Sequence, residues 1–237
     1  MFLMIDGIEG SGKSTILDAW KSHLANQNKN VFDFKKYSLE HGRYPTYDEI
    51  KPYEYIFTAE PTYIGIGKVI REELIKNGTD YPEQAIAEAY SLDRLILYKK
   101  IIIPALEDGK TIIQDRGVST SLCYQSTNGI LSLDFLAALP GNALALQHRP
   151  DWLILVQMSL ETAQTRLAKR YEKQDDAIFD KIEFQQKVAA TFASVNYQKL
   201  FLDKGTQITQ LNTDAKIDIM KQESLSLFNK ILCSNPR

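Results

Sequence analysis

Residues 1–20, MFLMIDGIEGSGKSTILDAW, join three kinds of sequence in a fixed order. The apolar run at residues 2–5 predicts a buried strand, and helix formers recur at helical spacing from Lys13 onward. The glycine-rich stretch between them continues neither element. Residues 7–14 satisfy the pattern G-x-x-x-x-G-K-[ST], and a strand before it and a helix after it are the context that this pattern requires. The stretch therefore predicts a phosphate-binding loop.

Such a loop binds anions through its backbone and through the helix that follows it. Glycines let successive N–H groups converge on phosphate oxygens, and the helix directs its positive dipole end at the same anion. Lys13 is expected to reach the β- and γ-phosphates, and Ser14 to ligate Mg²⁺. We therefore predict ATP and Mg²⁺ as cofactors. The predicted nucleotide-binding residues are Glu9, Gly10, Ser11, Gly12, Lys13, Ser14 and Thr15.

The chain has 237 residues, a net charge of −2 and two cysteines. This length suits one α/β domain, so we expect a single domain over residues 1–237. A nearly neutral chain without a long basic run argues against nucleic acid or an anionic membrane as a partner. Cys123 and Cys233 form no metal-ligand pattern, no secretory leader begins the chain, and no apolar run approaches the ~20 residues that span a bilayer. We therefore expect a cytoplasmic protein with free thiols.

Short apolar runs alternate with helical patterns along the chain. Runs that predict strands lie at residues 2–5, 55–57, 111–114, 152–158 and 208–211. A further apolar stretch, residues 31–34, follows the first helix. Alternating strands and helices imply a parallel sheet that is covered on both faces. We expect an α/β, P-loop NTPase fold with a five-stranded parallel sheet flanked by helices on both faces.

Residues 35–55 are rich in tyrosine, charge and proline and show no clear periodicity. Long irregular segments are either functional or merely mobile on the surface. A flap over the active site and a solvated insertion therefore both stay open for this segment.

Several charged residues stand where a predicted strand meets a loop. Glu60 lies just beyond one strand, and Asp115 and Arg116 end another. The carboxyl ends of parallel strands form the ligand-binding edge of an open sheet. A carboxylate there binds Mg²⁺, and a guanidinium holds phosphate oxygens in a bidentate fork, although the two also suit a structural salt bridge.

Four stretches resemble the thymidylate kinase family, whose members phosphorylate dTMP with ATP and Mg²⁺. They are GIEGSGKST at 7–15, TAEPT at 58–62, DRGVSTSLCYQ at 115–125 after a helix with Tyr90 and Arg94, and DKIEFQQKV at 180–188. The loop is similar to the bacterial type, which carries an acidic residue, here Glu9, and takes the missing cation from a lid. The stretch with Arg166 and Arg170 stands at the lid position, about residues 166–181.

The resemblance, which spans nearly the whole chain, implies roles for matching residues. The implied catalytic residues are Lys13, Asp115, Arg116, Arg166 and Arg170. Ser14 and Asp115 would form the metal site. Homodimers are usual for the family, and ATP and dTMP are the implied partners.

The implied acceptor site comprises Glu60, Arg71, Tyr90, Arg94, Arg116, Ser121, Tyr124 and Gln125. In the family pattern, Arg71 and Arg116 would hold the acceptor phosphate. Arg94 would hydrogen-bond the base, and Tyr90 would stack on it. Tyr124 would lie under the deoxyribose, and Ser121 and Gln125 would lie near the base. Glu60 would help to orient the Mg²⁺ shell through water.

Three departures from the family pattern bear on which monophosphate is used. Ala59 replaces an arginine, and TYIG at 62–65 replaces the region of a glycine pair. Gly117 stands where the family has an aromatic residue or histidine. The segment at 35–55 lies close in sequence to the acceptor loop.

Two rival functions stay open. A deoxynucleoside kinase shares a similar loop and an arginine lid, but needs a carboxylate base near the 5′-hydroxyl that it phosphorylates. Arg71 and Arg116 favour an anionic acceptor, whereas Glu60 suits the rival. A P-loop switch or scaffold without a small-molecule acceptor is the alternative from another class.

Overall fold

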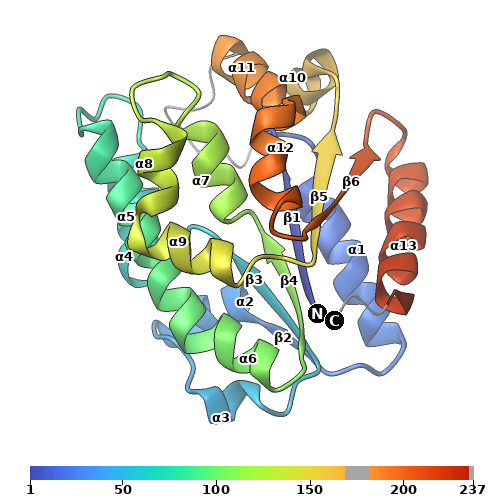
Figure 1. Cartoon of the computed structure of the whole chain (residues 1–237). Coiled ribbons are helices and arrows are strands. Elements are labelled where there is room, and N and C mark those ends of the chain that lie inside the picture. Colours follow the sequence, from blue (N-terminus) through green and yellow to red (C-terminus); the bar gives the residue numbers. More distant parts are fainter. Residues whose placement is uncertain (169–181, 235–237) are drawn as a thin grey trace.

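The computed structural model describes residues 1–168 and 182–234 (Figure 1). Within them, six strands form one parallel sheet in the order β2-β3-β4-β1-β5-β6. The strands are β1 (Phe2–Gly7), β2 (Val31–Asp33), β3 (Tyr55–Ala59), β4 (Thr111–Asp115), β5 (Trp152–Gln157) and β6 (Gln207–Asn212). The parallel α/β architecture is confirmed.

The predicted number of five strands is wrong, because the apolar stretch after the first helix adds a sixth. Its residues form β2, which pairs with β3 from Val31 to Asp33 at one edge of the sheet. Phe34 belongs to this stretch by hydrophobicity but begins a helix, since the side chain of Asp33 accepts a hydrogen bond from the Lys36 N–H.

Helices cover both faces of the sheet, and two π-helical turns, η1 and η2, extend two of them. The first half of the chain contains α1 (Lys13–Asn26), α2 (Phe34–His41), α3 (Tyr47–Ile50), α4 (Gly65–Val69), η1 (Ile70–Leu74), α5 (Glu83–Leu97), η2 (Tyr98–Ile102) and α6 (Ile103–Glu107). The second half contains α7 (Val118–Tyr124), α8 (Leu133–Ala138), α9 (Pro140–Gln147), α10 (Leu160–Ala168), α11 (Ile182–Ala193), α12 (Val195–Leu202) and α13 (Ile217–Cys233).

Alternate residues of β1 belong to two separate hydrophobic clusters, one on each face of the sheet. Leu3 and Ile5 pack with α1 and α13 on one face, where Trp20 stacks on Phe228 at 4.5 Å. Phe2 and Met4 join the larger cluster on the other face, which includes residues of α5, α7, α9, α11 and α12. This period of two is what a strand that is buried on both sides requires.

The segment at 35–55 is neither irregular nor merely solvated. It contains α2 and α3, and Phe34, with 1% of its surface exposed, anchors the start of α2 in the core. The ring of Tyr44 packs at a tilt against that of Phe34, with ring centres 5.4 Å apart, and its hydroxyl lies 3.4 Å from Thr62 Oγ1. The segment therefore rests on the loop that follows β3.

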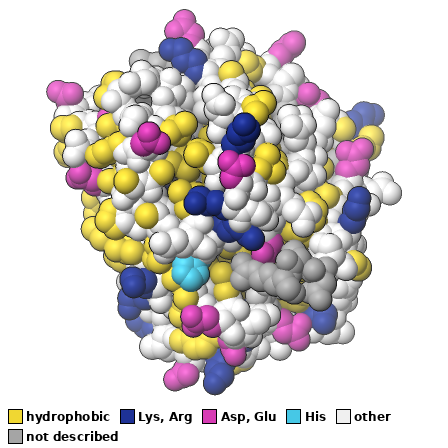
Figure 2. All heavy atoms as spheres, in the orientation of Figure 1, with side chains coloured by type: hydrophobic (Ala, Val, Ile, Leu, Met, Phe, Trp, Pro, Cys, Tyr) yellow, Lys and Arg dark blue, Asp and Glu magenta, His cyan; other side chains and the backbone are white. Residues whose placement is uncertain are grey.

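Figure 2 shows acidic and basic side chains interspersed over the face it presents. This pattern agrees with the small net charge of −2. In the described part of the chain, no helix combines the length and apolar character that crossing a membrane requires.

The carboxyl ends of the parallel strands meet at one edge of the sheet. The loop after β1 lies there together with Glu60 after β3 and with Asp115 at the end of β4. The chain leaves β1 toward β2 on one side and β5 toward β6 on the other, so the connections diverge beside β1. Such a divergence is the usual position of a ligand site in an open α/β sheet.

Candidate active site

At Gly7 and Gly12, the backbone of the loop between β1 and α1 disfavours any residue with a side chain. Gly12 adopts a φ of 90°, and a Cβ atom on Gly7 would lie 2.6 Å from the Val156 carbonyl oxygen. A Cβ atom on Gly12 would lie 3.4 Å from Arg166 Nη1. The two glycines of the sequence motif are therefore required by the observed path of the loop.

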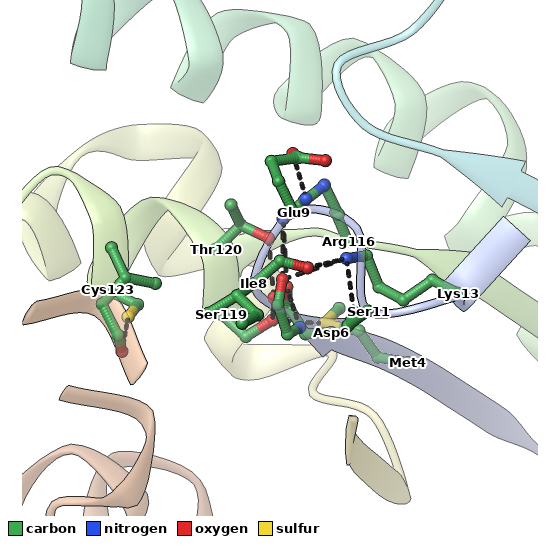
Figure 3. Close-up of polar contacts among 12 residues, drawn as sticks. Met4, Asp6, Ile8, Glu9, Ser11, Lys13, Arg116, Ser119, Thr120 and Cys123 are labelled. Atoms are coloured by element: carbon green, nitrogen blue, oxygen red, sulfur yellow. Dashed lines mark hydrogen bonds and ion pairs between the residues drawn. The ribbon is translucent and has the colours of Figure 1, made fainter. Parts of the chain in front are cut away.

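Lys13 lies over this loop with 6% of its surface exposed. Its ammonium group donates hydrogen bonds to the carbonyl oxygens of Gly7 at 3.0 Å and Ile8 at 2.8 Å, and to Ser11 Oγ at 3.2 Å (Figure 3). Burial, followed by the charge of Arg116, lowers the pKa of Lys13 to about 8. The lysine thus holds the loop in shape at the place where phosphates are expected.

Asp6, at the end of β1, is a buried hub that the sequence prediction missed. Its carboxylate accepts hydrogen bonds from the Gly7 N–H at 2.8 Å, from Thr120 Oγ1 at 2.6 Å and from Ser119 Oγ (Figure 3). Arg116 Nη1 lies 3.4 Å from the same carboxylate. Asp6 therefore joins the phosphate-binding loop to the start of α7. An acidic residue inside an otherwise apolar strand was the signal available in the sequence.

Arg116 extends from the end of β4 toward the loop. Its φ of 62° is unusual for a residue other than glycine. The guanidinium forms an ion pair with Glu9 and lies 5.5 Å from the ring centre of Tyr124. Glu9 and Asp6 thus hold Arg116 through ion pairs, and its guanidinium contacts the ring of Tyr124. The structure brings all of these residues together at the sheet edge.

Asp115 and Ser14 are the two residues that the sequence predicts to hold a metal. Oδ1 of Asp115 is buried and has no hydrogen-bond partner among the described residues. Burial raises the pKa of Asp115, and the charge of Lys13 opposes that rise. The side chain of Ser14 is exposed at the start of α1. In the described segments, no cluster of three or more His, Cys, Asp or Glu residues is placed to hold a metal alone. This suits Mg²⁺, which takes few protein ligands beside phosphates and water.

Glu60 and Arg94 form a buried ion pair behind the loop that follows β3. Glu60 Oε2 lies 2.6 Å from Arg94 Nη2, and both side chains are at most 2% exposed. Gln114 Nε2 donates to Glu60 Oε1 at 2.8 Å. Arg94 also donates to Ser121 Oγ at 2.9 Å and to Asn142 Oδ1. The structure therefore gives Glu60 and Arg94 several protein partners, including Asn142, which the sequence prediction did not identify.

Burial raises the pKa of Glu60 to about 7, with Arg94 opposing the rise and Asp93 adding to it. The folded protein then binds more protons than the unfolded chain between the ordinary glutamate pKa of 4.5 and about 7, so the contribution of Glu60 to the free energy of unfolding falls as pH rises through this interval. We expect the melting temperature of wild type minus that of Glu60→Gln to decrease from pH 5 to pH 7.5, measured by differential scanning calorimetry. Glu223→Gln, at an exposed site, controls for net charge, and a difference independent of pH would contradict the expectation.

The charges of three arginines act on Tyr90, which is half-buried. Burial raises the pKa of Tyr90 to about 12, and the charges of Arg71, Arg116 and Arg94, in that order, oppose the rise. Arg71 is held by the loop after β3, since its Nε donates to the carbonyl oxygens of Pro61 at 3.0 Å and Thr62 at 3.2 Å. The arginines come from η1, α5 and the end of β4, so the fold gathers cations that are far apart in the sequence.

Gln125 supplies unsatisfied polar atoms in the same region. Its Nε2 and Oε1 are buried and have no hydrogen-bond partner among the described residues, and the side chain follows α7 directly. Ser121 lies one turn earlier and accepts from Arg94. Unpaired buried amide atoms indicate a position at which a ligand would complete the hydrogen bonding.

Arg166, on α10, lies beside the loop near Gly12. Its Nη2 donates to the carbonyl oxygens of Thr213 at 2.7 Å and Ala215 at 3.2 Å. Thr213 in turn donates to the Ser11 carbonyl oxygen at 2.8 Å, which links this segment to the loop. Arg170 and most of the predicted lid lie outside the described residues.

The site thus offers two cationic regions, one of them at the glycine-rich loop. Lys13, Arg166 and Arg116 lie at the loop itself, whereas Arg71 lies at the loop that follows β3. Two regions of positive charge meet the requirement of a phosphoryl transfer, in which donor and acceptor oxygens are aligned and their charge is neutralised.

Comparison with known proteins identifies relatives along the whole chain. A family model described as thymidylate kinase matches residues 47–223. A probable thymidylate kinase from Thermococcus onnurineus (strain NA1) is 32% identical over 238 residues, which cover 96% of this chain and 96% of that relative. One from Pyrococcus horikoshii is 31% identical, with 95% and 98% covered. A thymidylate kinase from Chlorobaculum parvum (strain DSM 263 / NCIMB 8327) is 29% identical, with 82% of each chain covered.

Proposed function

Since the chain belongs to the thymidylate kinase family, we propose that it transfers the γ-phosphoryl group of ATP to dTMP, giving ADP and dTDP. The observation that carries the proposal is that Arg116 lies against the phosphate-binding loop that Lys13 also contacts, where it reaches the Gly7 carbonyl oxygen, Asp6 and Glu9. An acceptor that is already an anion needs such cations, and a base needs an aromatic ring and amide groups nearby. Tyr90 and Gln125 supply those groups.

On the acceptor side, Arg71 and Arg116 would hold the phosphate of dTMP. Arg116 is presented by Glu9 and Asp6, so its guanidinium is positioned before the nucleotide arrives. Preorganised charge of this kind lowers the barrier because little rearrangement is needed in the transition state. Tyr124, beneath Arg116, would contact the sugar, and Arg94, Ser121 and Gln125 would lie near the base.

On the donor side, Lys13 and Arg166 would neutralise the β- and γ-phosphates. Lys13 exchanges its contacts with the Gly7 and Ile8 carbonyl oxygens for phosphate oxygens when ATP enters the loop. Ser14 and Asp115 would hold Mg²⁺, which neutralises phosphate charge when it is bound. Arg170 would complete the lid, which excludes water so that ATP is not hydrolysed without an acceptor.

The state of Glu60 supports a monophosphate acceptor over a nucleoside. A nucleoside kinase needs a carboxylate that accepts the proton of the 5′-hydroxyl. The raised pKa of Glu60 would suit such a base, but its geometry does not, because the buried carboxylate is already held by Arg94 and Gln114. In the proposed reaction, the acceptor phosphate attacks as an anion and requires no such base.

A coupled assay of ADP release tests the proposal with dTMP, dUMP, dCMP, dGMP, thymidine and no acceptor. We expect the highest kcat/KM with dTMP. Turnover with thymidine and with no monophosphate would overturn the proposal in favour of a nucleoside kinase. Hydrolysis of ATP that is independent of every acceptor would instead indicate a P-loop switch.

Replacing Arg166 with alanine should lower kcat by about 10²-fold and change KM for dTMP much less. The reason is that Arg166 acts on charge that develops during transfer, at the donor end of the site. Steady-state kinetics with dTMP varied at saturating ATP separate the two constants. Arg170→Ala should show the same split, and Lys199→Ala, at an exposed position of α12, provides the control. An unchanged kcat in both arginine variants would remove the lid from the mechanism.

We also propose that the chain acts as a homodimer in the cytoplasm. Val69 and Leu92 support an interface, since they lie on the neighbouring helices α4 and α5 and are 48% and 46% exposed. Both cysteines, buried Cys123 and exposed Cys233, are free, as suits a reducing compartment. Light scattering coupled to gel filtration measures the mass of the assembly.

A further inference from the structure

Two cations contact the ring of Tyr63, in the loop that follows β3. Lys35 Nζ lies 4.7 Å from the ring centre, and Arg71 Cζ lies 4.0 Å from it. Both distances are within the range of a cation–π interaction. Within residues 1–168 and 182–234, neither Lys35 nor Arg71 forms an ion pair with a carboxylate. The ring therefore collects two positive charges that no acidic side chain balances.

The position of Lys35 is set by the packing of α2 and is not that of a freely solvated side chain. Phe34, the preceding residue, is buried, and the ring of Tyr44 packs against it at a tilt while its hydroxyl contacts Thr62. Lys36, the following residue, is exposed instead and lies 3.9 Å from Glu40. Adjacent lysines of one helix therefore have different environments, and only Lys35 faces the acceptor loop.

Arg71 connects this pair of cations to the proposed acceptor site. Its guanidinium is bound to the carbonyl oxygens of Pro61 and Thr62, and its charge is the largest of those opposing the raised pKa of Tyr90. Two like charges near one ring repel each other at a partly buried position. An anion bound near both cations would offset this repulsion, and the acceptor phosphate is the anion that the proposed site would bind.

We propose that Lys35 binds the phosphate of the acceptor nucleotide, as a third cation beside Arg71 and Arg116, and that Tyr63 positions it. This inference rests on the proposed function and deepens it, since it gives the segment at 35–55 a part in acceptor binding. The specific consequence is that Lys35 distinguishes a phosphorylated ligand from the corresponding nucleoside.

Kinetics and calorimetry on Lys35→Gln, Lys35→Arg and Lys36→Gln test the proposal in the full chain. We expect Lys35→Gln to raise KM for dTMP about tenfold, because one charge-assisted hydrogen bond to the phosphate is lost. The value of kcat should stay within about twofold of wild type. Lys35→Arg should restore most of the affinity, and Lys36→Gln should match wild type. In calorimetric titrations, Lys35→Gln should weaken dTMP binding and leave thymidine binding unchanged.

The possible failures give different results. An unchanged KM for dTMP in Lys35→Gln would overturn the role of Lys35 while leaving the proposed reaction intact. An equal loss of affinity for dTMP and thymidine would show that Lys35 only supports the fold of the acceptor loop. A wild-type protein that does not phosphorylate dTMP would refute the proposed function, and the calorimetric comparison would still decide whether Lys35 recognises phosphate.

Discussion

Replacing Lys13 with methionine should reduce kcat for phosphoryl transfer by about 10²–10³-fold, the cost of removing one preorganised charge from the transition state. Methionine approximates the length and apolar body of lysine but carries no ammonium group. The three contacts of Lys13 Nζ, to the Gly7 and Ile8 carbonyl oxygens and to Ser11 Oγ, would all be lost. A coupled assay at saturating ATP and dTMP measures the effect.

The same change should alter the response of the protein to ATP. A ligand that binds only the folded state raises the melting temperature, and at a fixed ligand concentration the gain grows with the logarithm of its affinity. Wild type should therefore gain thermal stability on addition of Mg·ATP, and Lys13→Met should gain less. Lys230→Met, at an exposed position near the end of α13, controls for the loss of one positive charge. A kcat for Lys13→Met within threefold of wild type would contradict a role at the donor phosphates.

Local motifs made the donor half of the site predictable. The strand, loop and helix at residues 2–26 follow from neighbouring residues, because loop glycines and a lysine at fixed spacing have one structural solution. The sequence predicts Glu60 and Asp115 at the sheet edge, because each stands at the end of an apolar run and parallel strands end at a common edge. The structure has them there, joined by a hydrogen bond from the Glu60 N–H to the Asp115 carbonyl oxygen at 3.0 Å.

Long-range contacts account for what the sequence did not predict. β2 has three residues and is a strand only because β3 pairs with it. The helices α8 and α9 were not predicted at all, although Ser132 caps the first and Pro140 begins the second. In α2 and α3, tyrosines have partners that periodicity does not detect: Tyr37 packs against Phe32 and His41, and Tyr47 donates to Asp108 at 2.8 Å.

The helices that were predicted as continuous have breaks where tertiary contacts require them. The pattern at residues 181–202 predicted one helix, but α11 and α12 are separated at Ser194, whose side chain accepts a hydrogen bond from the Tyr197 N–H. Tyr197 can then donate its hydroxyl to the Ser119 carbonyl oxygen at 2.9 Å. Such a break depends on a partner 78 positions away, which periodicity does not detect.

Asp6→Ala should lower the free energy of unfolding by roughly 3–5 kcal/mol, the range found when one member of a buried charged pair is removed. Asp6 is fully buried, and its carboxylate binds the Gly7 N–H, Ser119 and Thr120 as well as Arg116. Alanine would leave those donors without an acceptor in a site that water does not reach. Urea denaturation followed by circular dichroism measures the change.

Asp18→Ala and Asp6→Asn separate the causes of this loss. Asp18 lies on α1 with a 75% exposed side chain, so its removal should cost little. Asparagine at position 6 keeps the shape and one acceptor oxygen, so Asp6→Asn should lose less stability than Asp6→Ala. Because Asp6 also holds Arg116, Asp6→Ala and Asp6→Asn should each raise KM for dTMP more than KM for ATP. A loss below 1 kcal/mol for Asp6→Ala would show that Glu9 alone suffices to hold Arg116 and that the loop does not depend on the buried carboxylate.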